Sequence, residues 1–104
     1  MGWVYLGFAG LFEVAFAVML KLSENFTKPL PSVLFVVFAF CSFFLMTRAM
    51  LTIPIGTAYA VWAGIGAAGT LTVGILAFGD PVTFWRLVFA VTLIASIVGL
   101  KVVS

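Results

Sequence analysis

The sequence predicts an all-α integral membrane protein: a single domain over residues 1–104 with four transmembrane helices per protomer. Two observations predict this. The chain is 65% hydrophobic and 8% charged, with a mean hydropathy of +1.37, and a soluble domain of this size cannot bury so much apolar surface. The apolar residues also gather in runs of about 20, the length that crosses a bilayer as a helix. Helices are expected because they satisfy their own backbone hydrogen bonds in lipid.

The apolar runs place the four helices at about 3–20, 32–50, 57–78 and 82–101. Short connectors with helix-breaking residues separate them. Pro29 and Pro31 are expected to keep the first connector out of helix, and Pro54 does the same in the second. Asp80 and Pro81 predict a tight turn in the third. Because the connectors are short, successive helices run antiparallel and both termini lie on one side of the membrane.

The first helix carries one ionisable residue, Glu13, between Trp3 and Leu20. A charge at the bilayer centre costs about 2.5–3.5 kcal/mol on insertion scales, so such an acid is a functional-site hypothesis by default. Since removal from water disfavours the charged form, Glu13 is expected to exchange a proton for a cation near neutral pH. Gly10 and Ala17 lie on the same helix face. They either leave room beside the carboxylate or let another helix pack closely.

The second and third helices offer polar and aromatic groups for the same site. Ser42 has the hydroxyl best placed in sequence to bond Glu13, and bonding to its own helix backbone is the equal alternative. Tyr59 and Trp62 are three residues apart and share a face, so they and Phe16 predict an aromatic wall that holds an organic cation by cation–π attraction. The alternative is an interfacial belt or lipid-facing packing, which is stronger for Tyr59.

Small residues at intervals of four mark the surfaces where helices should approach closely. Two such rows run down the third helix, and its glycines also make it the helix most able to bend. One short row on the fourth helix predicts a packing or dimer contact. The positions are Ala60, Gly64 and Ala68, then Gly66, Thr70 and Gly74, and then Ala95 and Gly99.

The basic residues divide almost evenly between the two sides of the membrane. Arg48 and Lys101 lie on one side, and Lys21, Lys28 and Arg86 lie on the other. Because lysine and arginine bias sets orientation, this balance predicts insertion both ways and an antiparallel homodimer that brings two Glu13 side chains together. The alternative is one fixed orientation, with a partner subunit of opposite bias in a paired heterodimer.

The charged residues near the helix ends have simple expected roles. Lys21, Arg86 and Lys101 are expected to extend outward as interfacial anchors. Glu24, Asn25 and Asp80 are expected to be solvated loop positions.

Composition excludes several classes of function. Histidine is absent and Cys41 is the only cysteine, which excludes histidine-based metal sites, histidine acid–base chemistry and an intrachain disulfide. The net charge of +2 comes from helix ends and not from a basic surface, so no nucleic-acid partner is expected. We expect no enzyme activity, no catalytic residues, no metal and no cofactor.

Three stretches of the sequence and one serine resemble the small multidrug resistance family, whose members are four-helix, proton-coupled exporters working as antiparallel dimers. The resemblance covers essentially the whole chain. It rests on GLFEVAFAVMLK around Glu13, on Ser42, on PIGTAYAVWAGIGA over 54–67 and on the GLK that ends at Lys101. The form WxGIGA with a closing GLK resembles the guanidinium-exporter subtype more than the quaternary-ammonium subtype.

The resemblance implies roles for individual residues. Glu13 matches the shared proton and cation site, Tyr59 the substrate-gating tyrosine and Trp62 the cavity-lining tryptophan, while Gly10 and Ser42 match the supporting groups of the guanidinium branch.

Two pocket positions depart from that branch. Phe16 stands where it usually has tryptophan, and Ala63 where it usually has threonine. The missing indole N–H donor is expected to loosen the shell around the carboxylate and relax selectivity.

The sequence therefore predicts a proton-coupled antiporter of the bacterial plasma membrane, driven by the proton gradient. It would export small organic cations, most readily guanidinium or guanidinyl compounds, by alternating access at a Glu13 pair. Three alternatives remain: a promiscuous exporter of quaternary ammonium and aromatic cations, a non-transporting assembly subunit, and a passive cation pore.

Overall fold

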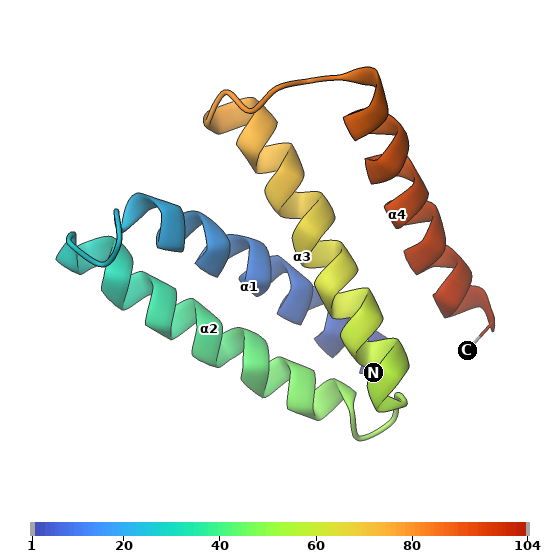
Figure 1. The fold of residues 1–104 in the computed structure, drawn as a ribbon. Coiled ribbons are helices and arrows are strands. Elements are labelled where there is room, and N and C mark those ends of the chain that lie inside the picture. The colour runs from blue at the N-terminus through green and yellow to red at the C-terminus, as the bar shows by residue number, and fades with distance from the viewer. Residues whose placement is uncertain (1, 104) are drawn as a thin grey trace.

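The computed structural model describes residues 2–103, and these form four α-helices and no strand. The helices are α1 (Gly2–Leu22), α2 (Pro29–Ala49), α3 (Ile55–Ala77) and α4 (Phe84–Val103), shown in Figure 1. Each is long and apolar enough to cross a membrane. The predicted all-α membrane fold is confirmed.

The helices lie side by side in a thin protomer. α1 packs along α2 as an antiparallel hairpin, α3 packs against α1, and α4 packs along α3 (Figure 1). The molecule measures 42 × 35 × 16 Å along its principal axes. The protomer is therefore much broader than it is thick.

A small buried core lies at one end of the protomer, where the first turns of α1 and α3 meet the last turns of α2. Its members are Leu6, Ala9, Met46, Ala49, Ile53, Ala58 and Val61. α4 contributes no buried residue. Most large apolar side chains therefore face outward, as expected when lipid is the solvent.

The start of α2 corrects one expectation. Pro29 and Pro31 do not keep the connector out of helix, because α2 begins at Pro29 itself. The first turn of a helix has no internal partners for its N–H groups, so proline fits there without loss. The chain reverses before it through Glu24, Asn25 and Phe26, whose φ angles of 48°, 63° and 64° are left-handed.

The connector between α3 and α4 corrects a second expectation from the sequence. Asp80 and Pro81 form no tight turn; the chain leaves α3 at Gly79, with φ of 70°, and then runs irregularly to α4 (Figure 1). The Thr83 hydroxyl accepts a 3.2 Å hydrogen bond from the Arg86 N–H and caps α4. Glycine takes the left-handed conformation at no steric cost, so the reversal falls one residue before the Asp80–Pro81 pair.

Candidate functional site

The Glu13 carboxyl group lies against the backbone of α3. Its contact there is Gly66, where an added Cβ would overlap Glu13 Oε1. Oε1 is buried and accepts no hydrogen bond from residues 2–103. Among the residues of the four helices, Glu13 is also the only acid. A glycine-lined notch thus holds an acid that no protein donor satisfies.

Ser42 does not bond Glu13, and neither does it bond its own helix. The fully buried hydroxyl donates a 2.7 Å hydrogen bond to the Ala9 carbonyl of α1 and accepts one of 2.9 Å from Trp62 Nε1 of α3. A helix carbonyl has a second lone pair for such a bond. Ala9 lies one turn before Glu13, so Ser42 ties three helices together beside the acid but leaves its carboxylate free.

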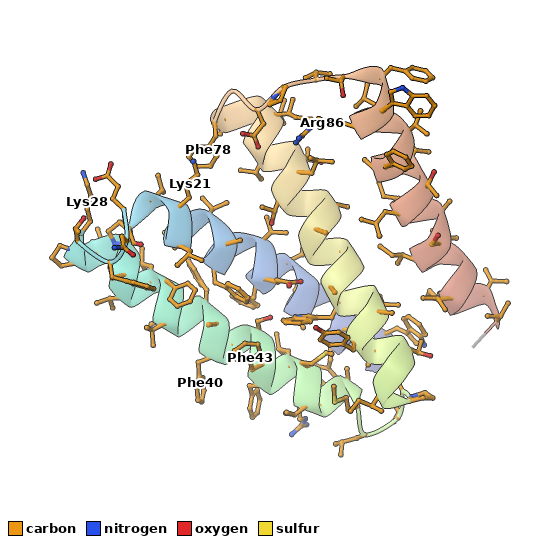
Figure 2. The ribbon with its side chains drawn as sticks, in the orientation of Figure 1. Lys21, Lys28, Phe40, Phe43, Phe78 and Arg86 are labelled. Carbon is orange, nitrogen blue, oxygen red and sulfur yellow. The ribbon has the colours of Figure 1, made fainter. Side chains whose placement is uncertain are left out.

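Five aromatic rings form a continuous row past this region. Phe16 contacts Phe35 and Phe43 at centroid distances of 5.7 and 6.0 Å. Phe43, labelled in Figure 2, contacts Trp62 at 5.9 Å, and Trp62 contacts Tyr59 at 5.8 Å. These distances are typical of favourable aromatic pairs. The structure therefore joins the three predicted aromatic residues through two phenylalanines of α2.

Sequence reasoning missed Phe35 and Phe43 as members of this row. A signal was present: they are eight residues apart with Ala39 midway, so all three share one face of α2. The deciding information was that this face meets Phe16, and such helix contacts follow from packing and not from spacing within α2.

The space expected beside the carboxylate at Gly10 is filled. An added Cβ at Gly10 would lie 2.8 Å from Cβ of Ile65, so this glycine serves the close approach of α1 and α3. Gly64 performs the same role between α3 and α4, where its added Cβ would lie 2.8 Å from Ile97 Cγ1. Gly74 is buried against the Asp80 side chain, and Ala68 is half-buried.

Four further predicted residues are partly covered or exposed in the protomer. Tyr59 is 60% exposed, and Ala63 is half-buried. Ala95 and Gly99 lie on the exposed side of α4, and nothing lies within 4 Å of a Cβ added at Gly99.

Two expectations about charged residues were wrong. Arg86 does not extend wholly outward, because its Nε is buried and has no partner among the described residues. Asp80 is not a freely solvated loop residue, because it is half-buried against Gly74. Lys21 and Lys101 stay exposed, yet their ammonium groups lie 5.5 Å and 5.4 Å from the ring centroids of Phe78 and Trp3.

A family model described as Small Multidrug Resistance protein matches residues 1–94. The chain belongs to the small multidrug resistance family. The match spans all of α1, α2 and α3 and the first half of α4, so this small multidrug resistance protein carries the family pattern in every part of the site described above.

Similar proteins include several named guanidinium exporter. That of Yersinia pseudotuberculosis is 43% identical over 104 residues, and that of Proteus vulgaris is 40% identical over 104, each covering 100% of both chains. That of Citrobacter freundii is 43% identical over 101 residues, 97% of this chain and 96% of the relative. This small multidrug resistance protein is accordingly a multi-pass protein of the bacterial inner membrane.

Proposed function

We propose that this small multidrug resistance protein is a proton-coupled antiporter that exports small organic cations, guanidinium above all, at Glu13. The observation that carries the proposal is the buried Oε1 with no donor among the described residues, on the only acid of the four helices. An ionised carboxylate in this setting needs a cation or a proton. The relatives named guanidinium exporter support the choice of cation.

Coupling follows from competition at one carboxylate. On one side of the membrane ionised Glu13 binds the cation, and on the other a proton displaces it. Each ligand lowers the affinity for the other by the same factor, because linkage is reciprocal. Guanidinium suits the role because its planar N–H groups match both carboxylate oxygens at once. No cofactor enters this scheme; the proton gradient is the driving force.

Two copies of the chain are needed to enclose the pathway. The protomer is flat, with 16 Å as its shortest dimension, and α4 has no buried residue with which to close a cavity. The nearly even division of basic residues favours an antiparallel homodimer, in which two carboxylates exchange up to two protons for one cation. A paired heterodimer is the alternative arrangement.

The aromatic row favours a second candidate, a broader exporter of methylated and aromatic cations. Phe16 supplies a ring but no N–H, and the Trp62 N–H is already donated to Ser42. No donor holds the Glu13 carboxylate in one orientation. Cations that lack N–H groups are therefore at a smaller disadvantage in binding affinity relative to guanidinium. Five rings in contact offer them cation–π attraction instead.

Transport by the purified chain in proteoliposomes tests the proposal. We expect guanidinium to evoke a proton-linked current on a solid-supported membrane. The current should weaken as the pH is lowered, because protons occupy Glu13, and it should vanish in Glu13→Gln. Glu24→Gln is the matched control, because Glu24 is exposed in the connector. Flux that persists in Glu13→Gln, or that ignores the pH gradient, would contradict the mechanism. Transport only after a second protein is added would show the paired heterodimer.

A further inference from the structure

A cavity of about 110 Å³ lies between α1 and α3, beyond the Glu13 notch. Ala17 and Thr70 line its walls, each four residues after a partner in the Glu13–Gly66 contact. Because α1 and α3 run in the same direction, these residues continue the contact by one helical turn. The cavity therefore lies between Glu13 and the end of the protomer that carries the α3–α4 connector.

A carboxylate and an aromatic ring are fixed together at the mouth of this cavity. The N–H groups of Phe78 and Asp80 both donate 3.0 Å hydrogen bonds to the Gly74 carbonyl. The Asp80 carboxylate packs on Gly74 so closely that an added Cβ there would overlap Oδ2. Among residues 2–103, the one ion pair joins Lys28 to Glu24, so the Asp80 carboxylate is held in place without a salt bridge.

The Lys21 ammonium group already lies over the Phe78 ring, although it forms no ion pair with Asp80. It lies 5.5 Å from the centroid of the Phe78 ring and lines the same cavity as Asp80. Figure 2 shows Lys21 and Phe78 next to each other at the ends of α1 and α3. An aromatic face with an adjacent carboxylate is the chemistry that recognises an organic cation. Here the ammonium group of an exposed lysine lies over the aromatic face.

We propose that Phe78 and Asp80 form a second, peripheral site for a monovalent organic cation, and that the Lys21 ammonium group is a tethered occupant displaced by the incoming cation. The cation class rests on the proposed function. Lys21 is eight residues from Glu13, so the peripheral site lies about 12 Å along α1 from the carboxylate. A cation entering from this end would meet Phe78 and Asp80 first. Competition with Lys21 would shorten its residence time there.

Binding of guanidinium in the Glu13→Gln chain isolates the peripheral site. The probe is guanidinium chloride, titrated at constant ionic strength into the full chain in lipid nanodiscs, with NMR shifts of the Gly79 and Asp80 amides as readout. Adding Lys21→Gln should strengthen binding roughly tenfold, because a tethered competitor acts at millimolar effective concentration. Adding Asp80→Asn should abolish the shifts.

Lys28→Gln and Glu24→Gln are the matched controls, since they make the same charge changes on the same side at residues that do not line the cavity. We expect each to change affinity by about twofold or less, because exposed charges are screened. Equal effects of Lys21→Gln and Lys28→Gln would overturn the proposal in favour of general surface charge. Phe78→Leu, with Lys21 intact, should weaken binding several-fold, and unchanged binding would also overturn it.

The outcomes separate the two proposals. If the unaltered chain transports guanidinium but Glu13→Gln with Lys21→Gln binds none, the peripheral site is wrong and the antiporter stands. If the peripheral site binds guanidinium but the unaltered chain transports none, the antiporter is wrong and the site stands.

Discussion

The Glu13 notch depends on a single hydrogen atom at Gly66. Any larger side chain there would occupy the volume of the carboxyl group. The carboxylate must then leave α3 or the helices must separate, and crowding of this kind costs about 1–3 kcal/mol. The position of the proposed transport site is thus set from α3 as much as from α1.

Gly66→Ala is predicted to lower the initial rate of guanidinium flux roughly tenfold, which corresponds to about 1.4 kcal/mol. Flux in proteoliposomes at matched protein density is the measurement. Gly56→Ala is the control in the same helix, because nothing lies within 4 Å of an added Cβ there. Equal rates in Gly66→Ala and the unaltered chain would show that the notch does not position Glu13.

Ser42→Ala is predicted to destabilise the protein by about 1–3 kcal/mol, because it leaves the Trp62 N–H unsatisfied in a buried site. The thermal unfolding midpoint and the tryptophan fluorescence report this loss. Ser96→Ala is the matched control, since the exposed Ser96 hydroxyl bonds only the Thr92 carbonyl of its own helix. A shift no larger than that of Ser96→Ala would mean that the bridge carries little stability.

For single residues, the sequence identified the functional candidates more successfully than it predicted their contacts. Glu13 stood out because no other acidic or basic residue shares its apolar run. Ser42 was singled out too, but its partner was not predictable. The Ala9 carbonyl is a backbone group, invisible in sequence, and it comes within reach only through the close packing of α1 on α2.

Among the helices, α1 and α2 meet along their aromatic faces. Phe16 inserts between Phe35 and Phe43, so its ring is held on both sides. The residue expected here in the guanidinium branch, tryptophan, would add an N–H on the Glu13 face of α1. The side chain at position 16, held in the α1–α2 interface, is therefore the place to test for a donor to the carboxylate.

Phe16→Trp is predicted to raise the preference for guanidinium over tetramethylammonium by roughly threefold to tenfold, since one new hydrogen bond to a charged group contributes about 1.5–3 kcal/mol before repacking costs. The measurement is the ratio of the two initial currents. Phe12→Trp is the control, because Phe12 lies one turn earlier and packs on Phe38 instead. An unchanged ratio would remove the explanation for broader selectivity.

Helix existence was predictable because apolar length is decided by bilayer thickness. The positions of the helix ends were less predictable from the sequence. Pro29 and Pro31 read as breakers, yet they start α2, and Gly79 reverses the chain before Asp80. Both errors concern residues with two compatible roles, and the choice between them depends on where the neighbouring helices lie.

The whole protomer presents α4 as an unsupported edge. It packs along α3, the ammonium group of its Lys101 lies over the Trp3 ring of α1, and no residue of it is buried. Such an edge fits the proposed dimer, in which a second copy packs against the small residues Ala95 and Gly99. The sequence predicted these positions from their spacing of four, but no feature of one chain fixes the geometry of two.

The double change Ala95→Leu with Gly99→Leu is predicted to shift the protein from dimer towards monomer, because the added bulk prevents close helix approach. Light scattering in detergent at several protein concentrations measures the mass. Val98→Leu, which adds bulk beside Gly99 at another exposed position, is the control and should leave the mass unchanged. A dimer that survives the double change would place the interface elsewhere.

The buried core at one end of the protomer has a mechanical consequence. It ties the beginnings of α1 and α3 to the end of α2, while α1 and α3 diverge towards their carboxyl ends (Figure 1). We therefore expect the packed end of the protomer to be rigid and the carboxyl ends of α1 and α3 to move more easily. Backbone amides near Leu6 and Val61 should exchange with deuterium far more slowly than those near Lys21 and Phe78. A small rotation of the helices about the packed core would then move the carboxyl ends of α1 and α3 without breaking the core.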